Sequence, residues 1–405
     1  MLSGGATDTQ RRLVRVRVKR RAALPFLVAA VLLGMTACGT AASVEPTATP
    51  TSMPAPATPT PTPADPVAAW VDERMSQLTI AQKAAALLML HAPGTDPAAL
   101  RSYVDAGVSG LILMSDNIAG TPDELTALTA AVQADAEAPV LVGIDEEGGE
   151  VQRLPWDDAA SAETLRAQPA AASRDAFASR AAMLAQAGVS VNFGIVADVT
   201  ADPESFISGR VLGTDPAGAA ERVAAAVSGE RGTVFSTLKH YPGHGAAPGD
   251  SHSSVPAAPL TIDEWRAGPS IPFAAGIDAG AEFVMTGHLA YPAVDPAPAS
   301  LSPEWHRILR EELGFAGVIV TDDMLMLQHN GLPEYADPGE NAVRAIAAGA
   351  DVLLYVLPAD PSEFGISVDG LAASIVAGVQ VGRISEARLD EAVERVLTLR
   401  RSLGA

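Results

Sequence analysis

The sequence predicts that residues 67–405 form a single (β/α)₈ barrel of the TIM type. Eight short aliphatic runs follow one another in this part of the chain, and helix-like segments lie between them. The runs lack two-residue alternation, so we expect strands of a parallel sheet that is covered on both faces. A doubly wound open sheet is the alternative that the same strand–helix order allows.

The predicted elements follow in chain order. The strands are expected at 87–90, 110–114, 140–145, 189–196, 233–241, 281–288, 317–323 and 350–356. Helices are expected between them, for instance at 122–138, 216–230 and 301–314, and a last helix is expected at 385–403. In this last helix Leu389, Val393, Val396, Leu397 and Leu403 form one apolar stripe, which is expected to face the protein interior.

The start of the chain has the pattern of a secretory signal. Residues 11–21 are strongly basic, and the apolar run that follows ends at Cys38, the one cysteine of the sequence. The tetrapeptide from Met35 to Cys38 resembles the lipobox of bacterial lipoproteins, in which the cysteine is lipidated. We therefore expect a lipoprotein signal peptide at 1–37 and a lipid on Cys38. An uncleaved signal anchor is the alternative.

Residues 38–66 are rich in proline and threonine and are predicted to form an extended tether. The protein is therefore expected to be exported and lipid-anchored at the cell membrane, facing the cell wall. Contact with the membrane is expected only through the anchor. A single cysteine provides no disulfide framework, so the core alone must hold the domain together.

The charge excludes one class of partner. The formal net charge is −21 at pH 7, and it becomes −27 without residues 1–37. Such an acidic chain is expected to repel nucleic acid and anionic lipid headgroups. We expect a monomer, although the sequence itself carries no signal for the oligomeric state.

Charged and imidazole side chains stand at the ends of four predicted strands. They are Asp145 at the third, Lys239 and His240 at the fifth, His288 at the sixth, and Asp322 and Asp323 at the seventh. In a barrel the carboxyl ends of the strands converge on the active site. We therefore expect these residues to meet in one pocket.

Two carboxylates follow the seventh strand, and retaining glycoside hydrolysis needs one as a nucleophile. Asp322 comes first after the apolar run and is expected to present its carboxylate at the barrel mouth. Its alternative role is that of a helix N-cap, a common one for Asp after a strand. Asp323 is able to fill that role and to leave Asp322 free.

A proton donor is expected in the loop after the fifth strand. Asp250 stands two residues before His252, and a carboxylate bound to one ring nitrogen fixes the tautomer and raises the basicity of the other. The preceding residues are rich in glycine, alanine and proline, so the loop is expected to be mobile.

Metal binding is the main alternative for these histidines. His240, His244, His252 and Asp250 could supply ligands, but they lie in a Gly/Pro-rich loop without metal-site spacing. A phosphate-binding loop is excluded by the order of its glycines and lysine. Neither a metal nor another cofactor is expected.

Four motifs in the expected order resemble those of glycoside hydrolase family 3, in its single-domain bacterial β-N-acetylhexosaminidase branch. The most specific is KHYPGHG at 239–245 followed by Asp250-Ser251-His252. The others are IDEEGGEVQR at 144–153, MTGH at 285–288 and TDDM at 321–324. The resemblance covers the chain from about residue 70 to its end.

The resemblance implies a role for each matching residue. Asp322 becomes the nucleophile that forms a glycosyl-enzyme, His252 the acid/base, and Asp250 its partner. The hydroxyls of a terminal N-acetylglucosamine are expected to be bound by Asp145, Arg153, Lys239 and His240. Arg210, in SGRVLGTDP at 208–216, matches the arginine of the family's RSFGxDP element and is expected to bind the sugar as well. His244 is expected to maintain the shape of the loop.

Two departures from the family pattern concern sugar binding rather than catalysis. Glu150 stands where the family usually has arginine, and Val211-Leu212 stand where it usually has Ser-Phe. The expected function is removal of terminal, non-reducing N-acetylglucosamine from cell-wall fragments, as in peptidoglycan turnover. Chitin oligosaccharides and glycoconjugates are alternative substrates. Phosphorolysis and non-catalytic sugar binding by a lipoprotein are alternative activities.

Overall fold

The computed structural model describes residues 65–404. The predicted signal peptide, Cys38 and the predicted tether up to residue 64 lie outside the described residues. Asp65 and Pro66 begin helix α1 (Pro66–Gln77), because the Asp65 carboxylate accepts a hydrogen bond of 2.9 Å from the amide of Val67. An Asp N-cap followed by Pro at the first helical position is a favourable helix start.

All eight predicted strands are present, each within its predicted range. They are β1 (Leu88–Leu90), β2 (Gly110–Leu113), β3 (Leu141–Ile144), β4 (Val191–Val196), β5 (Phe235–Tyr241), β6 (Phe283–Thr286), β7 (Val318–Thr321) and β8 (Leu353–Tyr355). The strands are buried almost throughout, as expected for a sheet covered on both faces.

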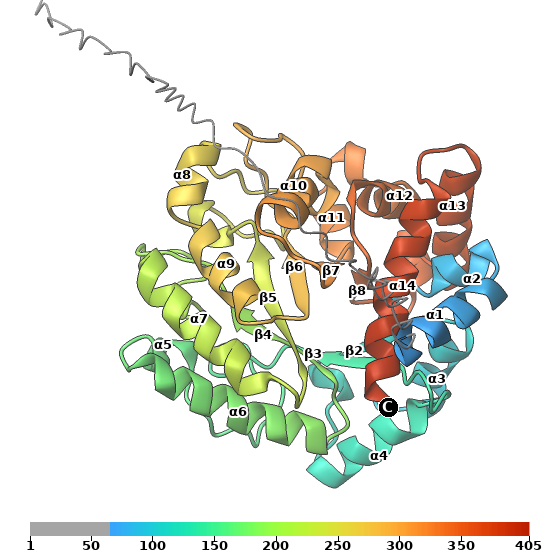
Figure 1. The fold of residues 1–405 in the computed structure, drawn as a ribbon, viewed down its shortest axis with the longest axis horizontal. Helices are drawn as coiled ribbons and strands as arrows, with labels where there is room; N and C mark the ends of the chain where they lie inside the picture. The colour runs from blue at the N-terminus through green and yellow to red at the C-terminus, as the bar shows by residue number, and fades with distance from the viewer. Residues whose placement is uncertain (1–64, 405) are drawn as a thin grey trace, which may run out of the picture. The chain divides into compact units, whose positions relative to one another are not determined.

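The strands form one parallel sheet that closes on itself. The strand order is β7-β6-β5-β4-β3-β2-β1-β8, and β1 pairs with both β2 and β8. Between the two ends of this order, Val320 and Val352 form a parallel bridge, and the Thr321 amide donates to the Val352 carbonyl at 3.0 Å. The predicted (β/α)₈ barrel is therefore confirmed, and the open-sheet alternative is excluded (Figure 1).

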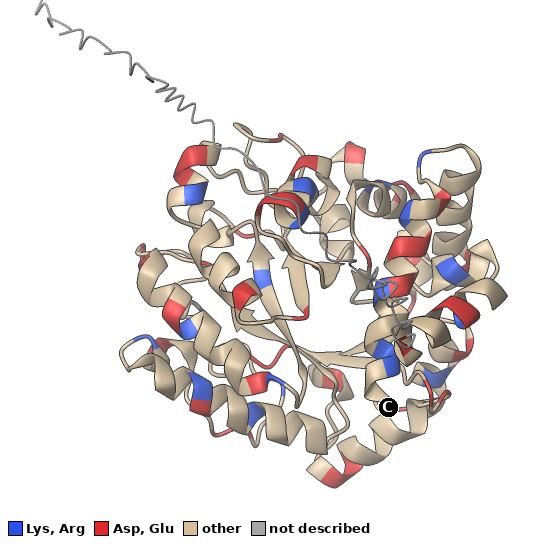
Figure 2. Ribbon diagram, viewed as in Figure 1, with Lys and Arg blue, Asp and Glu red and all other residues tan. Residues whose placement is uncertain are grey.

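Helices surround the strands as an outer layer (Figure 1). After α1 they are α2 (Ile80–Ala85), α3 (Pro97–Asp105), α4 (Pro122–Val132), α5 (Ala162–Leu165), α6 (Ala170–Gln186), α7 (Pro216–Glu230), α8 (Ile262–Ala267), α9 (Ser270–Asp278), α10 (Pro303–Arg307), α11 (Leu325–His329), α12 (Pro338–Ala348), α13 (Val368–Gln380) and α14 (Glu386–Leu403). Figure 2 shows acidic and basic residues scattered over these helices, while the strands carry few charges.

Three details of the predicted helices were wrong. Helix α4 ends at Val132 instead of 138, because Asp135 accepts the amides of Glu137 and Ala138 and forms a turn. The helix expected at 301–314 is divided into α10 and a π-helical turn, η4 (Ile308–Glu312). In α14 the apolar stripe is buried except for Leu403, which is 37% exposed because it is the last residue of the helix.

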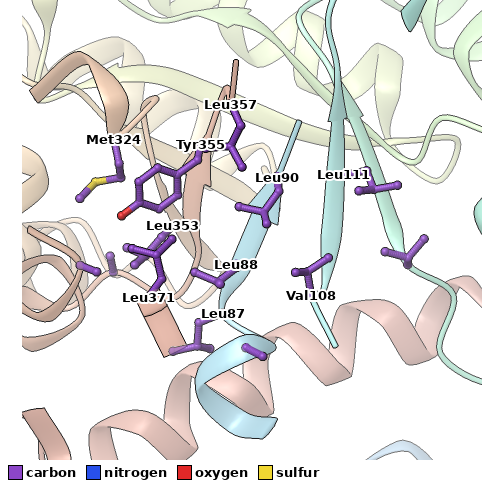
Figure 3. Packing of buried hydrophobic residues seen from close by; sticks show 14 of the residues in the cluster. Leu87, Leu88, Leu90, Val108, Leu111, Met324, Leu353, Tyr355, Leu357 and Leu371 are labelled. Carbon is purple, nitrogen blue, oxygen red and sulfur yellow. The ribbon is translucent and has the colours of Figure 1, made fainter. Parts of the chain in front are cut away.

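Alternating side chains of the strands fill two cores. Met89, Phe193, Phe283, Val320 and Leu354 belong to a cluster drawn from strands around the barrel. Leu88 and Leu90 belong instead to the layer between the strands and the helices, where they lie near Leu353, Tyr355 and Leu371 (Figure 3). Side chains along the strands are thus used for packing inside and outside the barrel, and the residues at the carboxyl ends of the strands form the site.

Candidate active site

A cavity of about 380 Å³ lies at the carboxyl ends of the strands. The predicted site residues that line it are Asp145, Arg153, Arg210, Lys239, His240, His252 and Asp322. They come from the ends of β3, β5 and β7 and from three loops. The structure thus brings together seven of the eight residues predicted for catalysis and sugar binding. The eighth, Asp250, contacts His252 from behind.

Two cations form the floor of the cavity, and both are neutralised. The Lys239 ammonium lies 2.8 Å from an Asp145 oxygen and 2.7 Å from a Glu147 oxygen. The Arg210 guanidinium donates two hydrogen bonds to Glu147, at 2.7 and 2.9 Å. Burial alone would raise the pKa of Asp145, but Lys239 and Arg153 lower it to about 2. Both acids therefore bind to these cations as carboxylates.

Arg153 is held less tightly than Lys239 and Arg210. One of its terminal nitrogens lies 3.4 Å from Asp145, whereas its buried Nε–H has no partner among the described residues. Its backbone amide and that of Leu154 donate to Glu146, each at 2.9 Å. The Arg153 side chain is thus fixed by its backbone and by one long ion pair, and its unpartnered Nε–H is a cost to stability.

His240 is oriented by a buried acid that follows β4. Its Nδ1 lies 2.7 Å from a carboxylate oxygen of Asp198, and its amide donates to the same oxygen at 3.1 Å. Burial lowers the pKa of His240 well below its ordinary value, and the charge of Arg210 lowers it further. The imidazole is therefore neutral, with its Nε2 on the side of Arg210, at 3.4 Å.

The two acids after β7 have different surroundings. Asp323 accepts the amides of Leu325 and Val356 at 3.0 and 2.9 Å, so it supports the start of α11 and leaves Asp322 free for the cavity. Burial raises the pKa of Asp323 to about 7. Burial also favours a raised pKa for Asp322, but His240, His288, the Asp323 amide and Lys239 lower it below its ordinary value.

Asp322 thus remains an ionised carboxylate beside Asp323, whose raised pKa favours the protonated form.

His288 does not line the cavity, since its Nδ1 binds the Ser300 hydroxyl at 2.7 Å and its Nε2 binds the Asp323 carbonyl at 2.9 Å. Its ring supports the turn on which both acids stand.

Asp250 and His252 form a hydrogen-bonded pair in the loop after β5. The His252 Nδ1 lies 2.6 Å from an Asp250 oxygen, and the His252 amide donates to the same oxygen at 2.9 Å. The side chain of His252 is 65% exposed and that of Asp250 is 46% exposed, in contrast to the buried floor of the cavity. With Nδ1 bound to the carboxylate, Nε2 is available to donate and accept a proton.

The shape-keeping role expected for His244 stays a prediction, and the structure places this residue against the cavity. Its ring is fully buried against Phe206, at a centroid distance of 4.6 Å, and neither ring nitrogen has a hydrogen-bond partner among the described residues. Its backbone holds the loop, since the amide donates to Asp198 at 2.5 Å and the carbonyl accepts the amide of Ala247 at 2.9 Å.

Sequence reasoning missed Glu147 and Asp198, the two acids behind the cations and the imidazole. Glu147 lies within the IDEEGG motif, and Asp198 follows the fourth strand by two residues. Asp198 also stands just past a strand end, which in a barrel is the same signal that indicates Asp145 and Asp322.

The departures from the family pattern lie at the edge of the cavity or behind it. Glu150 is exposed, and its carboxylate lies over Gly209, where an added Cβ would be 2.5 Å from its Oε2. Val211 and Leu212 are buried. Within residues 65–404, no group of three or more His, Cys, Asp or Glu side chains is arranged to hold a metal ion.

Comparisons with known proteins agree with this architecture. Residues 70–399 match the model of the glycosyl hydrolase family 3 N-terminal domain. A β-hexosaminidase of Stenotrophomonas maltophilia strain R551-3 is 35% identical over 284 residues, which are 67% of this chain and 82% of the relative.

Two solved structures have the same fold. A family 3 β-N-acetylglucosaminidase from Paenibacillus sp. strain FPU-7 is 33% identical with a TM-score of 0.74, over 81% of this chain and 64% of that one. A β-N-acetylhexosaminidase from Beutenbergia cavernae is 31% identical with a TM-score of 0.69, over 80% of this chain and 99% of the other.

Proposed function

The chain belongs to glycosyl hydrolase family 3 and is a glycosidase, and we propose that it is a retaining β-N-acetylhexosaminidase. It removes a terminal, non-reducing N-acetylglucosamine from a glycan. The names of the relatives support this substrate. The observation that carries the mechanism is an ionised Asp322 in a cavity that the Asp250–His252 pair also borders.

The reaction has two steps. The Asp322 carboxylate attacks the anomeric carbon while the bond to the leaving oxygen breaks, and the Nε2–H of His252 transfers its proton to that oxygen. Asp250 holds the Nδ1–H and stabilises the ring in both protonation states. Water then gives a proton to Nε2 and attacks the same carbon, which releases the sugar and regenerates the Asp322 carboxylate.

The cavity floor supplies donors and acceptors for the sugar hydroxyls. Lys239, Arg210 and Arg153 are donors, whereas Asp145 and the Nε2 of His240 accept. Glu147 holds Lys239 and Arg210 from behind, and Asp198 holds His240. A sugar that lacks one of the hydroxyls leaves a buried group without a partner, which is the basis of strong selectivity.

Water is the acceptor that the charge distribution favours over phosphate. The cavity carries three Lys or Arg residues, and Lys239 and Arg210 are already bound to Asp145 and Glu147. Asp322 adds a further negative charge. A phosphate ion therefore meets more carboxylates than free cations, so hydrolysis is the expected reaction.

The cellular setting belongs to the same proposal. The basic and apolar run that ends at Cys38 and the Pro/Thr-rich residues 38–66 support an exported, lipid-anchored enzyme facing the cell wall. Peptidoglycan fragments with terminal β-1,4-linked N-acetylglucosamine are the substrate class that this location favours. Labelling with a radioactive fatty acid tests the anchor: the unmodified protein is expected to take up the label and a Cys38→Ser variant is not, and an unlabelled unmodified protein would contradict lipidation.

The central experiment is a panel of aryl β-glycosides, measured with and without phosphate and with a chelator. The aryl N-acetylglucosaminide is expected to be hydrolysed, without an effect of phosphate or chelator. Asp322→Asn should reduce kcat by at least about 10⁴-fold, because the covalent step is lost. His252→Ala should be severe on poor leaving groups and milder on good ones, which need less protonation.

A mechanism-based fluorosugar that labels Asp322 provides the direct test. Labelling of the intact enzyme, and none in Asp322→Asn, is the expected result. Full activity of Asp322→Asn would overturn the mechanism. Sugar binding without turnover by the intact protein would instead identify a non-catalytic binding protein, and a phosphate-dependent release of sugar phosphate would identify a phosphorylase.

A further inference from the structure

Asp198 is a buried acid that the proposed two-step reaction does not use. It follows β4, its side chain is fully buried, and it does not line the cavity. Each of its oxygens is nevertheless bound to the segment that carries the site. One oxygen accepts the amide and the ring Nδ1–H of His240, and the other accepts the amide of His244.

The chemistry of this contact determines where the proton of His240 resides. Burial raises the pKa of Asp198, whereas His244 and the backbone amides of His244 and His240 favour its ionised form. The carboxylate already takes two backbone amides as donors and acts as an acceptor, so the His240 Nδ1 at 2.7 Å carries the hydrogen. The neutral ring then has a lone pair at Nε2. The donor nearest to that lone pair is an Arg210 nitrogen, at a long distance of 3.4 Å.

An acceptor in this place has a use that a donor would not have. Lys239, Arg210 and Arg153 already provide donors in the cavity, and Arg210 stands directly beside His240. The opposite tautomer would place an N–H against the guanidinium, and two donors repel each other. A bare Nε2 instead accepts a proton from a hydroxyl group of the bound sugar.

We propose that Asp198 is a positioning residue that fixes His240 as a hydrogen-bond acceptor for one sugar hydroxyl. The proposal rests on the glycosidase activity proposed above. The same carboxylate also holds the amide of His244 at 2.5 Å, where the loop toward Asp250 and His252 begins. Asp198 thereby connects the sugar-binding end of β5 to that loop.

The test combines a near-isosteric variant with substrates that each lack one hydroxyl. In Asp198→Asn the amide group replaces a carboxylate oxygen, so His240 loses the partner that selects its tautomer. We expect kcat/KM on the aryl N-acetylglucosaminide to fall roughly 10- to 100-fold. Removal of the hydrogen-bond partner that orients a metal-ligating histidine has an effect of this size. The same comparison of Asp198→Asn with the unmodified enzyme is made on the 3-, 4- and 6-deoxy analogues. For the one analogue that lacks the hydroxyl bound by His240, the loss in kcat/KM should be below about twofold, because the interaction that Asp198 supports is already absent.

Asp202→Asn is the matched control. Asp202 lies four residues further along the same loop, is exposed, and accepts the amide of Glu204 at 3.0 Å. It is expected to leave kcat/KM unchanged on all four substrates. An equal loss for Asp198→Asn on every deoxy analogue would overturn the proposal, because such a loss indicates a general structural defect.

A measurement on the unmodified enzyme keeps the proposal testable even if Asp198→Asn folds poorly. Nitrogen-15 NMR of labelled histidines, with His240→Asn used to assign the signal, is expected to show a protonated Nδ1 and a bare Nε2. A protonated Nε2 in the neutral ring would overturn the proposal. If the unmodified enzyme does not cleave the aryl substrate, the proposed function fails, but the tautomer is still measured.

Discussion

At the scale of single residues, the cavity depends on acids that lie behind the groups facing the substrate. Glu147 is 2% exposed at its side chain and binds two cations, Lys239 and Arg210, which are themselves 2% and 10% exposed. Burial of an ion pair costs desolvation free energy, so the pair gives little net stability. Removal of one partner is different, because it leaves the remaining charges buried without compensation.

The first prediction concerns this acid. Glu147→Gln should lower the free energy of unfolding by about 3 kcal/mol and raise KM, since Arg210 would lose its paired carboxylate and Lys239 would keep only Asp145. Urea titration and steady-state kinetics on the aryl substrate measure the two effects. The control is Glu304→Gln, which breaks an exposed pair with Arg307 and should cost less than about 1 kcal/mol. Equal effects of the two variants would contradict the argument.

Which residues the sequence could predict depends on what their side chains contact. Asp145, Lys239 and Asp322 stand at strand ends, and barrel geometry alone places such residues at the cavity. Glu147 and Asp198 bind other protein groups, and no spacing in the sequence states which acid meets which cation. The free ring nitrogens of His244 are likewise a result of packing against Phe206, far from it in sequence.

At the scale of elements, the loop after β5 is placed by close backbone packing. An added Cβ at Gly245 would lie 2.2 Å from the carbonyl oxygen of Val199, which follows β4. This contact involves backbone on both sides, so neither partner can yield by rotating a side chain. The loop that carries Asp250 and His252 is therefore anchored against the end of β4.

The second prediction tests this anchor. Gly245→Ala should displace the loop, lower kcat and reduce stability by about 1–3 kcal/mol, the usual cost of overpacking. Stopped assays of kcat and thermal unfolding measure these effects. Gly120→Ala is the control, because its added Cβ would meet only the flexible end of the Glu124 side chain, at 3.4 Å. An unchanged kcat in Gly245→Ala would show that the loop position tolerates the shift.

The elements themselves were predictable to different degrees. Each strand is a continuous aliphatic run, and the covering helices keep it buried on both faces, so the run alone identifies it. Helix ends depend on side-chain hydrogen bonds instead. The turn at Asp135 ends α4 early, and α10 passes into a π-helical turn at Ile308.

At the scale of the whole molecule, buried acids with opposite pKa shifts set how stability depends on pH. Asp145 has a folded-state pKa of about 2, so its contribution is full above its ordinary pKa near 4 and is lost as the pH falls toward 2. Glu230, the last residue of α7, is fully buried against Asn192 of β4, and burial raises its pKa to about 8. Its folded form retains a proton that the unfolded chain releases above about pH 4.5, so stability falls as the pH rises from there to 8.

The last prediction follows from the loss of stability that Glu230 causes as the pH rises. Glu230→Gln removes the titration, and its carbonyl can still accept the bond of 2.6 Å from Asn192. The unfolding free energy of the variant should exceed that of the unmodified enzyme by an amount that grows between pH 5 and 8. The slope is on the order of 1 kcal/mol per pH unit, because one pKa unit corresponds to about 1.4 kcal/mol. Urea titrations at several pH values measure it.

Glu221→Gln on the same helix is the control, since Glu221 is exposed and should show no such slope. Arg180 and Glu282 act on the pKa of Glu230 in opposite directions, so neither neighbour alone explains its shift. A pH-independent difference between Glu230→Gln and the unmodified enzyme would mean that Glu230 is ionised in the folded domain. Arg180 would then have to compensate the charge from within the buried layer between the strands and the helices.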